Sequence, residues 1–119
     1  MGIGAIIPTG RRAGRESGTG ASGAIRDVEA GIEFELFSSS FCGACRQTRA
    51  VLEQAARRLP GSRISEHDVA FEPERAEGEN IVATPTVIVR SPAGAEALRA
   101  TGVPTIAQVL DAAARAASL

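Results

Sequence analysis

The sequence predicts an α/β domain preceded by an N-terminal extension, and three observations support this prediction. From Gly31 onward, short apolar or β-branched runs alternate with helix-like runs in the order β-α-β-α-β-β-α. The two cysteines, Cys42 and Cys45, lie where the first strand gives way to the first helix. The chain has 119 residues, of which 44% are hydrophobic, and can bury one core without disulfide staples. We therefore expect a single compact domain over residues 31–119.

The N-terminal part has a different composition. Residues 10–23 are rich in Gly, Ser and Arg and hold almost no bulky apolar side chain. Such a segment cannot bury enough area to offset the entropy lost on ordering, so we expect a flexible extension over residues 1–30. Within it, residues 3–7 could add a strand and residues 24–30 one or two helical turns. The glycines form no phosphate-binding loop, because no strand leads in and no Lys-Ser/Thr pair follows.

The first strand and helix of the domain follow from hydrophobic periodicity. Apolar residues alternate with Glu33 and Glu35, which predicts a strand whose glutamates are solvated. The alternating apolar positions are Ile32, Phe34 and Leu36. The next helix has an apolar stripe at helical spacing, and Pro60-Gly61 ends it. The stripe consists of Val51, Leu52, Ala55, Ala56 and Leu59.

The second half of the domain contains more strands than helices. Residues 63–69 predict a second strand, and a short polar helix starts in residues 72–77. Residues 84–90 are β-branched and apolar, which predicts a strand, and residues 97–101 pair with it as a hairpin across the turn at 91–94.

The last predicted helix has a capping-box start. Thr105 and Gln108 have the required spacing, with Pro104 just before them. We expect this helix to bury Ile106, Val109, Leu110 and Ala113.

Composition excludes some classes of partner. The net charge of -1 and the pI near 5.8 provide no basic face for a polyphosphate. With four Phe and no Trp or Tyr, the chain has no aromatic platform on which bases could stack. We therefore expect no nucleic-acid partner and a core of aliphatic residues and alanine.

No export or membrane signal is evident. The apolar stretch at residues 2–7 is too short for the core of a signal peptide and is followed by Arg11 and Arg12 instead of a cleavage site. No run approaches the ~20 apolar residues that span a bilayer. We therefore expect a cytoplasmic protein without a membrane partner. In the cytoplasm a Cys-x-x-Cys pair is better explained by redox turnover or metal than by a structural disulfide.

The position of the cysteine pair suggests reactive sulfur. If Cys42 caps the helix, the unpaired N–H groups of the first turn and the positive end of the helix dipole favour its thiolate. A thiolate attacks disulfides, whereas a thiol does not. One helical turn brings Cys45 to the same side, close enough to form a disulfide with Cys42. We expect Cys42 to be the more exposed sulfur, with a pKa below the usual ~8.5.

The chain resembles the thioredoxin superfamily from about residue 32 to its end. Cys42-Gly43-Ala44-Cys45 is similar to the family's Cys-Gly-Pro-Cys, and a basic residue, Arg46, follows it as in the family. Thr84-Pro85-Thr86 resembles the segment that holds the family's cis-proline. Pro73, Gly102 and the capped last helix also fall at positions that the family shares.

This resemblance implies a thioredoxin-like fold with a central mixed four-stranded sheet and a thiol–disulfide oxidoreductase activity in electron transport and cell redox homeostasis. Cys42 would attack and Cys45 would resolve, so the redox-active disulfide itself serves and no other cofactor or metal is needed. The implied substrate groove consists of Phe41, Gly43, Ala44, Thr84 and a cis Pro85. The implied partners of the monomer are disulfide-containing proteins or low-molecular-weight thiols and a separate reductant such as a thioredoxin reductase.

Several positions depart from the family pattern. Phe41 stands where thioredoxins have Trp, and Ala44 and Ala50 stand where they have Pro. The buried Asp that moves the proton of the second cysteine falls at Leu36, and its Lys neighbour falls at Glu66. Glu35 or Glu66 could replace the missing proton carrier.

Thr84 before the proline is more similar to glutaredoxins and some disulfide isomerases than to thioredoxin. However, residues 101–105 lack the Gly-Gly and acidic pair with which glutaredoxins hold glutathione. The substrate of neither relative is therefore implied.

Other interpretations remain open at this point. The two cysteines could be small buried hydrophobes, and Pro85 could be an ordinary trans edge proline. His67 is more consistent with a surface side chain than with a base or ligand, and zinc would need more ligands than one chain offers. An iron–sulfur cluster bridged between two chains through Cys42 is a further alternative. The rival of the enzyme is a thioredoxin-fold binding or adaptor module that docks a partner without turnover.

Overall fold

The computed structural model describes residues 31–119. The predicted extension over residues 1–30, with its strand at 3–7 and its helical turns at 24–30, lies outside the described residues. Within the described part the elements follow one another in the predicted order. They are β3 (Glu33–Ser38), α2 (Gly43–Arg57), β4 (Arg63–Asp68), α3 (Pro73–Gly78), β5 (Thr86–Arg90), β6 (Glu96–Thr101) and α4 (Ile106–Ala116).

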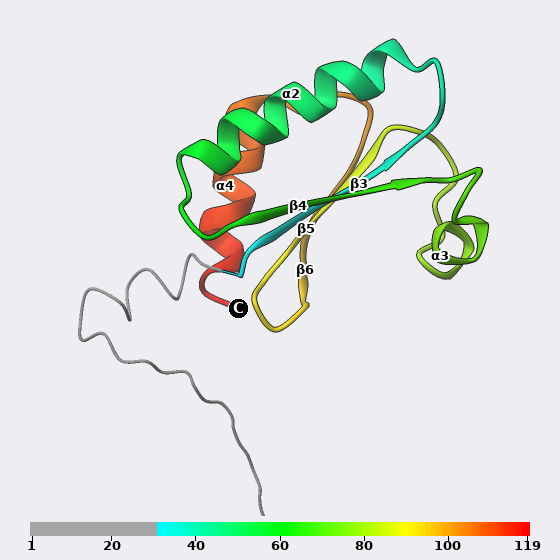
Figure 1. Cartoon of the computed structure of the whole chain (residues 1–119). Helices are drawn as coiled ribbons and strands as arrows, with labels where there is room; N and C mark the ends of the chain where they lie inside the picture. The colour runs from blue at the N-terminus through cyan, green and yellow to red at the C-terminus, as the bar shows by residue number, and fades with distance from the viewer. Residues whose placement is uncertain (1–30) are drawn as a thin grey trace, which may run out of the picture.

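The strands form one mixed sheet in the order β4-β3-β5-β6. β3 and β4 run parallel, with Phe34 opposite Ile64, and α2 is the crossover helix that a parallel pair needs. β5 pairs antiparallel with both β3 and β6. Figure 1 shows α2 and α4 over one face of the sheet and α3 at its end. The predicted thioredoxin-like arrangement, an α/β fold with a mixed four-stranded sheet, is therefore confirmed.

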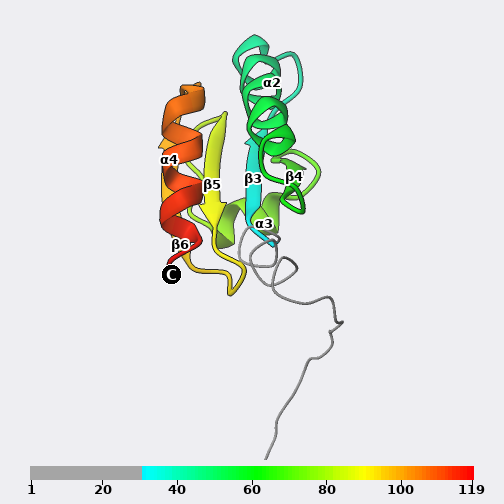
Figure 2. The same cartoon turned by 90° about the vertical axis from the view of Figure 1, so that its left-hand side faces the viewer.

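One face of the sheet is closed by α2 and α4, which lie side by side against the strands (Figure 2). Alternate side chains of β3 and β5 meet the apolar stripes of both helices there in one buried cluster. Its largest members include Ile32, Phe34, Leu36, Leu52, Val87, Val89 and Val109. Aliphatic side chains and alanines dominate this layer, as the composition predicts.

α4 begins as predicted but buries a different stripe. The Thr105 hydroxyl accepts a hydrogen bond from the Gln108 N–H at 3.1 Å, and the Gln108 side chain accepts one from the Thr105 N–H at 2.8 Å. The buried residues are Val109, Ala112, Ala113 and Ala116, whereas Ile106 and Leu110 are only partly buried. Small alanine side chains let the helix lie close to its neighbours, so the longer side chains remain at the margin of the contact.

The opposite face of the sheet holds an ion-pair cluster around Glu35. The prediction that Glu35 is solvated is wrong, because this residue is 4% exposed. Its carboxylate accepts hydrogen bonds from Arg90 Nε at 2.9 Å and from Arg75 Nη1 at 3.4 Å, and His67 Nε2 lies 3.2 Å away. Three partners from β4, α3 and β5 therefore cover the carboxylate and satisfy its hydrogen bonds.

His67 is part of the same cluster and is not a simple surface side chain. Its side chain is 14% exposed, and its ring packs against Phe37 with 5.1 Å between the centroids. Its Nδ1 lies 3.2 Å from both carboxylate oxygens of Glu72, the N-cap residue of α3. The histidine thus connects β4 to the start of α3.

No helix within residues 31–119 is long and apolar enough to cross a membrane.

Candidate active site

Cys42 is the N-cap residue of α2. Its backbone is extended, with φ -107° and ψ 104°, so its side chain turns back over the first helical turn. The Cys42 Sγ accepts a hydrogen bond from the backbone N–H of Cys45 at 3.1 Å. This turn has no acidic residue, so the unpaired N–H groups and the helix dipole act on the sulfur without opposition from a carboxylate there. The predicted capping role of Cys42 is confirmed.

The two cysteines form a disulfide, with their Cα atoms 5.2 Å apart. Cys42 is half-buried, whereas Cys45 is only 1% exposed. A disulfide on another molecule can therefore approach the Cys42 sulfur but not the Cys45 sulfur. The expected difference in exposure between the two cysteines is confirmed.

The two residues between the cysteines complete the turn. Gly43 is exposed, and a Cβ there would lie 3.6 Å from the Arg46 guanidinium, an ordinary contact, so space does not require glycine. Ala44 is half-buried, and its carbonyl accepts a hydrogen bond from the Thr48 hydroxyl at 2.8 Å. Arg46 itself is exposed.

Phe41 precedes the pair in an unusual conformation. Its φ is +58°, in the left-handed region that residues with bulky side chains rarely adopt. This backbone conformation costs roughly 1–2 kcal/mol. Its side chain is fully exposed, with a relative accessibility of 102%. The backbone of the β3–α2 loop thus holds an aromatic ring in solvent directly beside Cys42.

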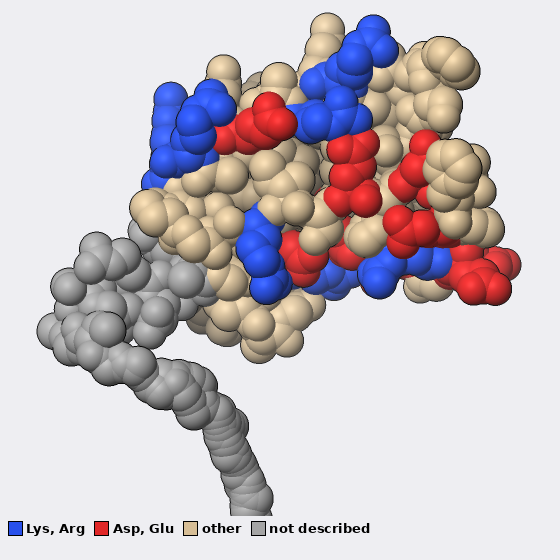
Figure 3. Space-filling model, in the orientation of Figure 1, with Lys and Arg blue, Asp and Glu red and all other residues tan. Residues whose placement is uncertain are grey.

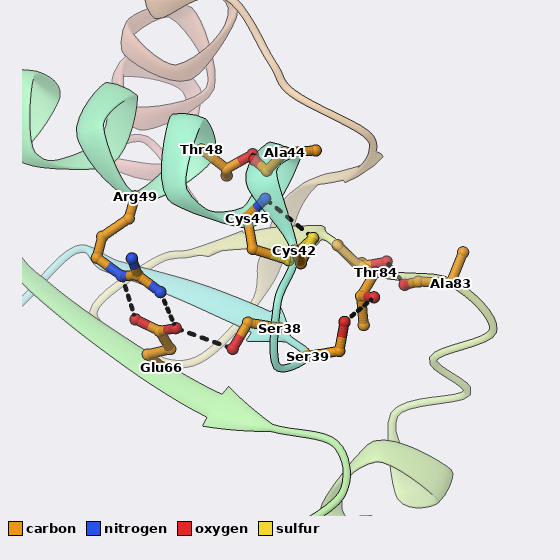
Figure 4. Close-up of a disulfide and its surroundings, with 11 residues drawn as sticks. Ser38, Ser39, Cys42, Ala44, Cys45, Thr48, Arg49, Glu66, Ala83 and Thr84 are labelled. Atoms are coloured by element: carbon orange, nitrogen blue, oxygen red, sulfur yellow. Dashed lines mark hydrogen bonds and ion pairs between the residues drawn. A yellow bond between two sulfur atoms is a disulfide. The ribbon is translucent and has the colours of Figure 1, made fainter.

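Thr84 and Pro85 come from the segment before β5 and lie beside the cysteine loop. The Thr84–Pro85 peptide bond is cis, the isomer that the resemblance implies. The Thr84 hydroxyl lies 2.9 Å from that of Ser39, within hydrogen-bond distance, and Figure 4 shows Thr84 next to Cys42. Pro85 is buried, and its carbonyl accepts a hydrogen bond from the Gly102 N–H at 2.9 Å. Within residues 31–119, the Thr84 N–H and C=O have no hydrogen-bond partner.

A carboxylate lies on the other side of the pair. Glu66 accepts two hydrogen bonds from Arg49, at 2.7 and 2.5 Å, and one from the Ser38 hydroxyl at 2.8 Å. Figure 4 shows Ser38 between Glu66 and the cysteines. The hydrogen bond from Arg49 holds the pKa of Glu66 below its usual value; burial opposes this effect, and Ser38 adds to it. Glu66 is therefore ionised at neutral pH.

The structure separates the two candidate proton carriers. Glu66 pairs with Arg49 of α2 and so lies on the helix face of the sheet, as do the cysteines. Glu35 points to the opposite face, where Arg90 and Arg75 hold it. The hypothesis that Glu35 serves the cysteine pair is therefore wrong.

Sequence reasoning did not single out Ser38, Ser39 or Arg49. The serines follow directly on the apolar alternation of the first strand, and Arg49 is one helical turn beyond Cys45, on a face that can reach the sheet. These are weak signals without knowledge of strand register. Within residues 31–119 no group of three or more His, Cys, Asp or Glu side chains is arranged to hold a metal ion.

Comparisons with known proteins identify the fold of this chain. No protein-family model and no curated protein matches the chain. Among solved structures, chloroplastic thioredoxin z is similar, with 24% identity and a TM-score of 0.66 over 82% of this chain and 88% of that one. A mutant thioredoxin from Halobacterium salinarum NRC-1 has 18% identity and a TM-score of 0.66, with 80% and 84% of the two chains covered.

The oxidised mitochondrial thioredoxin 3 of Saccharomyces cerevisiae is similar as well, with 18% identity, a TM-score of 0.61, and 79% and 89% of the two chains covered. Likeness at these identities establishes a shared fold and not a shared activity. The chain therefore has the thioredoxin fold, with a disulfide at the start of its first described helix.

Proposed function

We propose that this protein is a thiol–disulfide oxidoreductase that cycles Cys42 and Cys45 between dithiol and disulfide. The observation that supports it most is the asymmetry of the pair, since an accessible sulfur caps a helix and a buried sulfur lies one turn further on. The thioredoxin fold of the solved neighbours is consistent with this activity.

The reaction has two exchange steps. The Cys42 thiolate attacks one sulfur of a substrate disulfide, the substrate S–S bond breaks, and the other substrate sulfur leaves and takes up a proton. The Cys45 thiol then loses its proton and attacks the Cys42 sulfur, which releases the second substrate thiol. Two electrons and two protons pass to the substrate, and the Cys42–Cys45 disulfide remains. A low-molecular-weight thiol or a reductase returns the dithiol form.

The surrounding residues have roles in binding and proton transfer. Phe41 contributes apolar contact beside the attacking sulfur. The N–H and C=O of Thr84, which have no partner within residues 31–119, pair with an extended substrate backbone next to Pro85. Gly43 and Ala44 leave the approach to Cys42 open. The ionised Glu66 accepts the Cys45 proton through solvent or the Ser38 hydroxyl. The cycle needs no further cofactor, and we propose the reducing cytoplasm as its location.

A disulfide-reduction assay tests this proposal. Reduction of insulin disulfides is followed with thioredoxin reductase or dithiothreitol as alternative electron donors, for the wild type, Cys42→Ser and Cys45→Ser. We expect Cys42→Ser to have no activity above the uncatalysed rate. Cys45→Ser should accumulate a mixed disulfide, visible by mass spectrometry, because no second sulfur remains to release it.

Alkylation rates provide the matched control. Between the two single variants, the one that retains Cys42 should react faster with iodoacetamide at neutral pH, because Cys42 is accessible and faces the helix N-terminus. A faster reaction at Cys45 would overturn the assignment of roles. Wild-type protein that binds insulin without reducing it with either donor would instead favour the adaptor module.

A further inference from the structure

We propose that this site prefers protein disulfides that have an apolar and a basic residue beside them, and that these residues dock on a hollow beside Thr84 and on the acidic surface of the adjoining helix α3. The inference rests on the proposed function, because the same cysteine pair does the chemistry. It goes beyond that function in naming the sequence around the substrate disulfide.

The hollow adjoins the cysteine site. It has a volume of about 240 Å³, is open to solvent, and is lined by Val69, Ile81, Val82, Ala83 and Thr84. Thr84 is also within hydrogen-bond distance of Ser39 in the cysteine loop. A polypeptide that meets Cys42 and runs past Thr84 therefore enters the hollow next.

One exposed apolar side chain lines the hollow, and a second follows two residues after another lining residue. Val82 is 93% exposed and Phe71 is 82% exposed. Phe71 lies two residues beyond Val69, in a turn where its N–H donates to the Asp68 carbonyl at 3.1 Å. Single exposed apolar residues are common, but two on the segments that line one hollow are consistent with a contact surface. The free energy gained by burying these side chains therefore remains available to a partner.

The segment around α3 is acidic, and it adjoins the hollow because Val69 and Ile81 pack against the buried cluster that contains Ala76 of α3. Residues 66–79 contain six acidic residues and one arginine. Some of these carboxylates are neutralised, since Glu66 pairs with Arg49 and Glu79 with Arg90. The side chains of Glu74 and Glu77 are exposed and have no ion-pair partner within residues 31–119.

Figure 3 shows acidic side chains gathered over β4 and α3 and basic side chains over both ends of α2. Charges interact over about 10 Å at 0.1 M salt, so this field reaches residues that flank a bound disulfide. A basic residue there is attracted and an acidic one is repelled, mainly through the rate of association. The occupant that fits is an extended disulfide-bearing segment with one apolar and one or two basic residues.

The preference for basic flanking residues can be tested with two peptide disulfides that are assayed separately. Each of two peptides contains the same intramolecular disulfide and a neighbouring leucine. They differ only at two flanking positions, which are both Arg in one peptide and both Glu in the other. Fully reduced protein, freed of reductant, is mixed with each peptide. Samples are acid-quenched and alkylated, and mass spectrometry gives the rate of Cys42–Cys45 disulfide formation. Each rate is divided by that of dithiothreitol with the same peptide, which removes differences in intrinsic disulfide reactivity.

We expect the Arg peptide to react about tenfold faster at low salt and less than twofold faster at 0.5 M salt, where screening is strong. The double variant E74Q/E77Q should reduce this ratio about threefold. A matched double variant, E53Q/D111N, removes the same charge from the exposed faces of α2 and α4 and should leave the ratio unchanged. V82S should slow both peptides several-fold, whereas L119S, at the exposed C-terminus, should not.

A small uncharged disulfide separates this inference from the proposed function. Bis(2-hydroxyethyl) disulfide is too small to reach the hollow, so we expect it to oxidise the wild type and all these variants at one common rate. If it fails to oxidise the wild type, the proposed function fails. If it does react and the two peptides have equal rates, or the Glu peptide is faster, the function stands and the docking preference is overturned.

Discussion

The two faces of the sheet are stabilised by different interactions, although β3 contributes side chains to both. On the face under α2 and α4, alternate β3 side chains such as Phe34 and Leu36 are fully buried among aliphatic residues. On the other face, the next residue in the alternation is Glu35, which is almost as deeply buried but among charges. Helices α2 and α4 exclude water from the first face. On the second face, long polar side chains cover Glu35, next to a smaller apolar cluster of Phe37, Ala76 and Ile88.

This difference shows that an alternating strand need not have a solvated side. The methylene groups of Arg90 and Arg75 and the ring of His67 shield Glu35 while their polar ends satisfy it. Burial acts to lower the pKa of Arg90, but the hydrogen bonds and the negative charges of Glu35 and Glu79 together raise it. The carboxylate near the cysteines, Glu66, is by contrast about a third exposed and can exchange protons with solvent.

The largest expected effect on stability is on the apolar face. Leu52 is fully buried between α2 and the sheet, so Leu52→Ala should reduce the free energy of unfolding by about 3–4 kcal/mol, measured by urea denaturation followed by circular dichroism. The neighbouring variant Glu53→Ala changes an exposed residue on the same helix and should change it by less than about 0.5 kcal/mol. Equal losses would mean that the helix–sheet layer is not the core.

Substitutions on the ion-pair face should reduce the free energy of unfolding somewhat less. Glu35→Ala leaves Arg90 and His67 without their central acceptor, but both can still reach water, so we expect a loss of about 2–3 kcal/mol, below the ~3–5 kcal/mol of a fully buried pair. Glu33→Ala, on the same strand face but half-buried, should lose less than about 1 kcal/mol. The alkylation rate of Cys42 should remain unchanged in both variants. A loss of Cys42 reactivity in Glu35→Ala would connect the two faces and contradict their separation.

The smallest effect should come from Glu66→Gln, and it should depend on pH. Because the pKa of Glu66 in the folded state lies below its ordinary value of 4.5, its stabilising contribution is present above that value and is lost as the pH falls through the folded pKa. The difference in unfolding free energy from the wild type should be under about 1 kcal/mol at pH 7 and vanish at lower pH. A difference that grows on acidification would mean that the Arg49 pair does not form.

The same variant should also affect the second exchange step. We expect release of substrate from the mixed disulfide to slow by about tenfold, less than a well-matched base contributes, because the low pKa of Glu66 makes it a weak proton acceptor. Rapid-quench kinetics that separate attack from release will measure this, and attack by Cys42 should keep its rate. If the rate of substrate release is unchanged, the Cys45 proton passes directly to solvent and Glu66 does not accept it.

Local signals in the sequence were sufficient for the element order and for part of the site. The Cys42 cap, the Thr105–Gln108 capping box and the helix stop at Pro60-Gly61 all depend on residues within a few positions of one another. The exposure of Cys42 and the burial of Cys45 follow from the same helical turn. The stripe of α4 was only partly predicted, because alanines that pack closely against a neighbour have no strong periodic signal of their own.

Sequence by itself therefore determined the alternation of elements and the placement of the cysteines at a helix start, since hydrophobic periodicity and helix capping act over one or two turns. Tertiary structure alone decided which carboxylate lies near the cysteines, which one is buried with arginines, and which side chain meets Thr84. These contacts join residues that are 17 to 55 positions apart, such as Arg49 with Glu66 and Glu35 with Arg90. Strand register and sheet face bring them together, and a shift by one residue would exchange the faces.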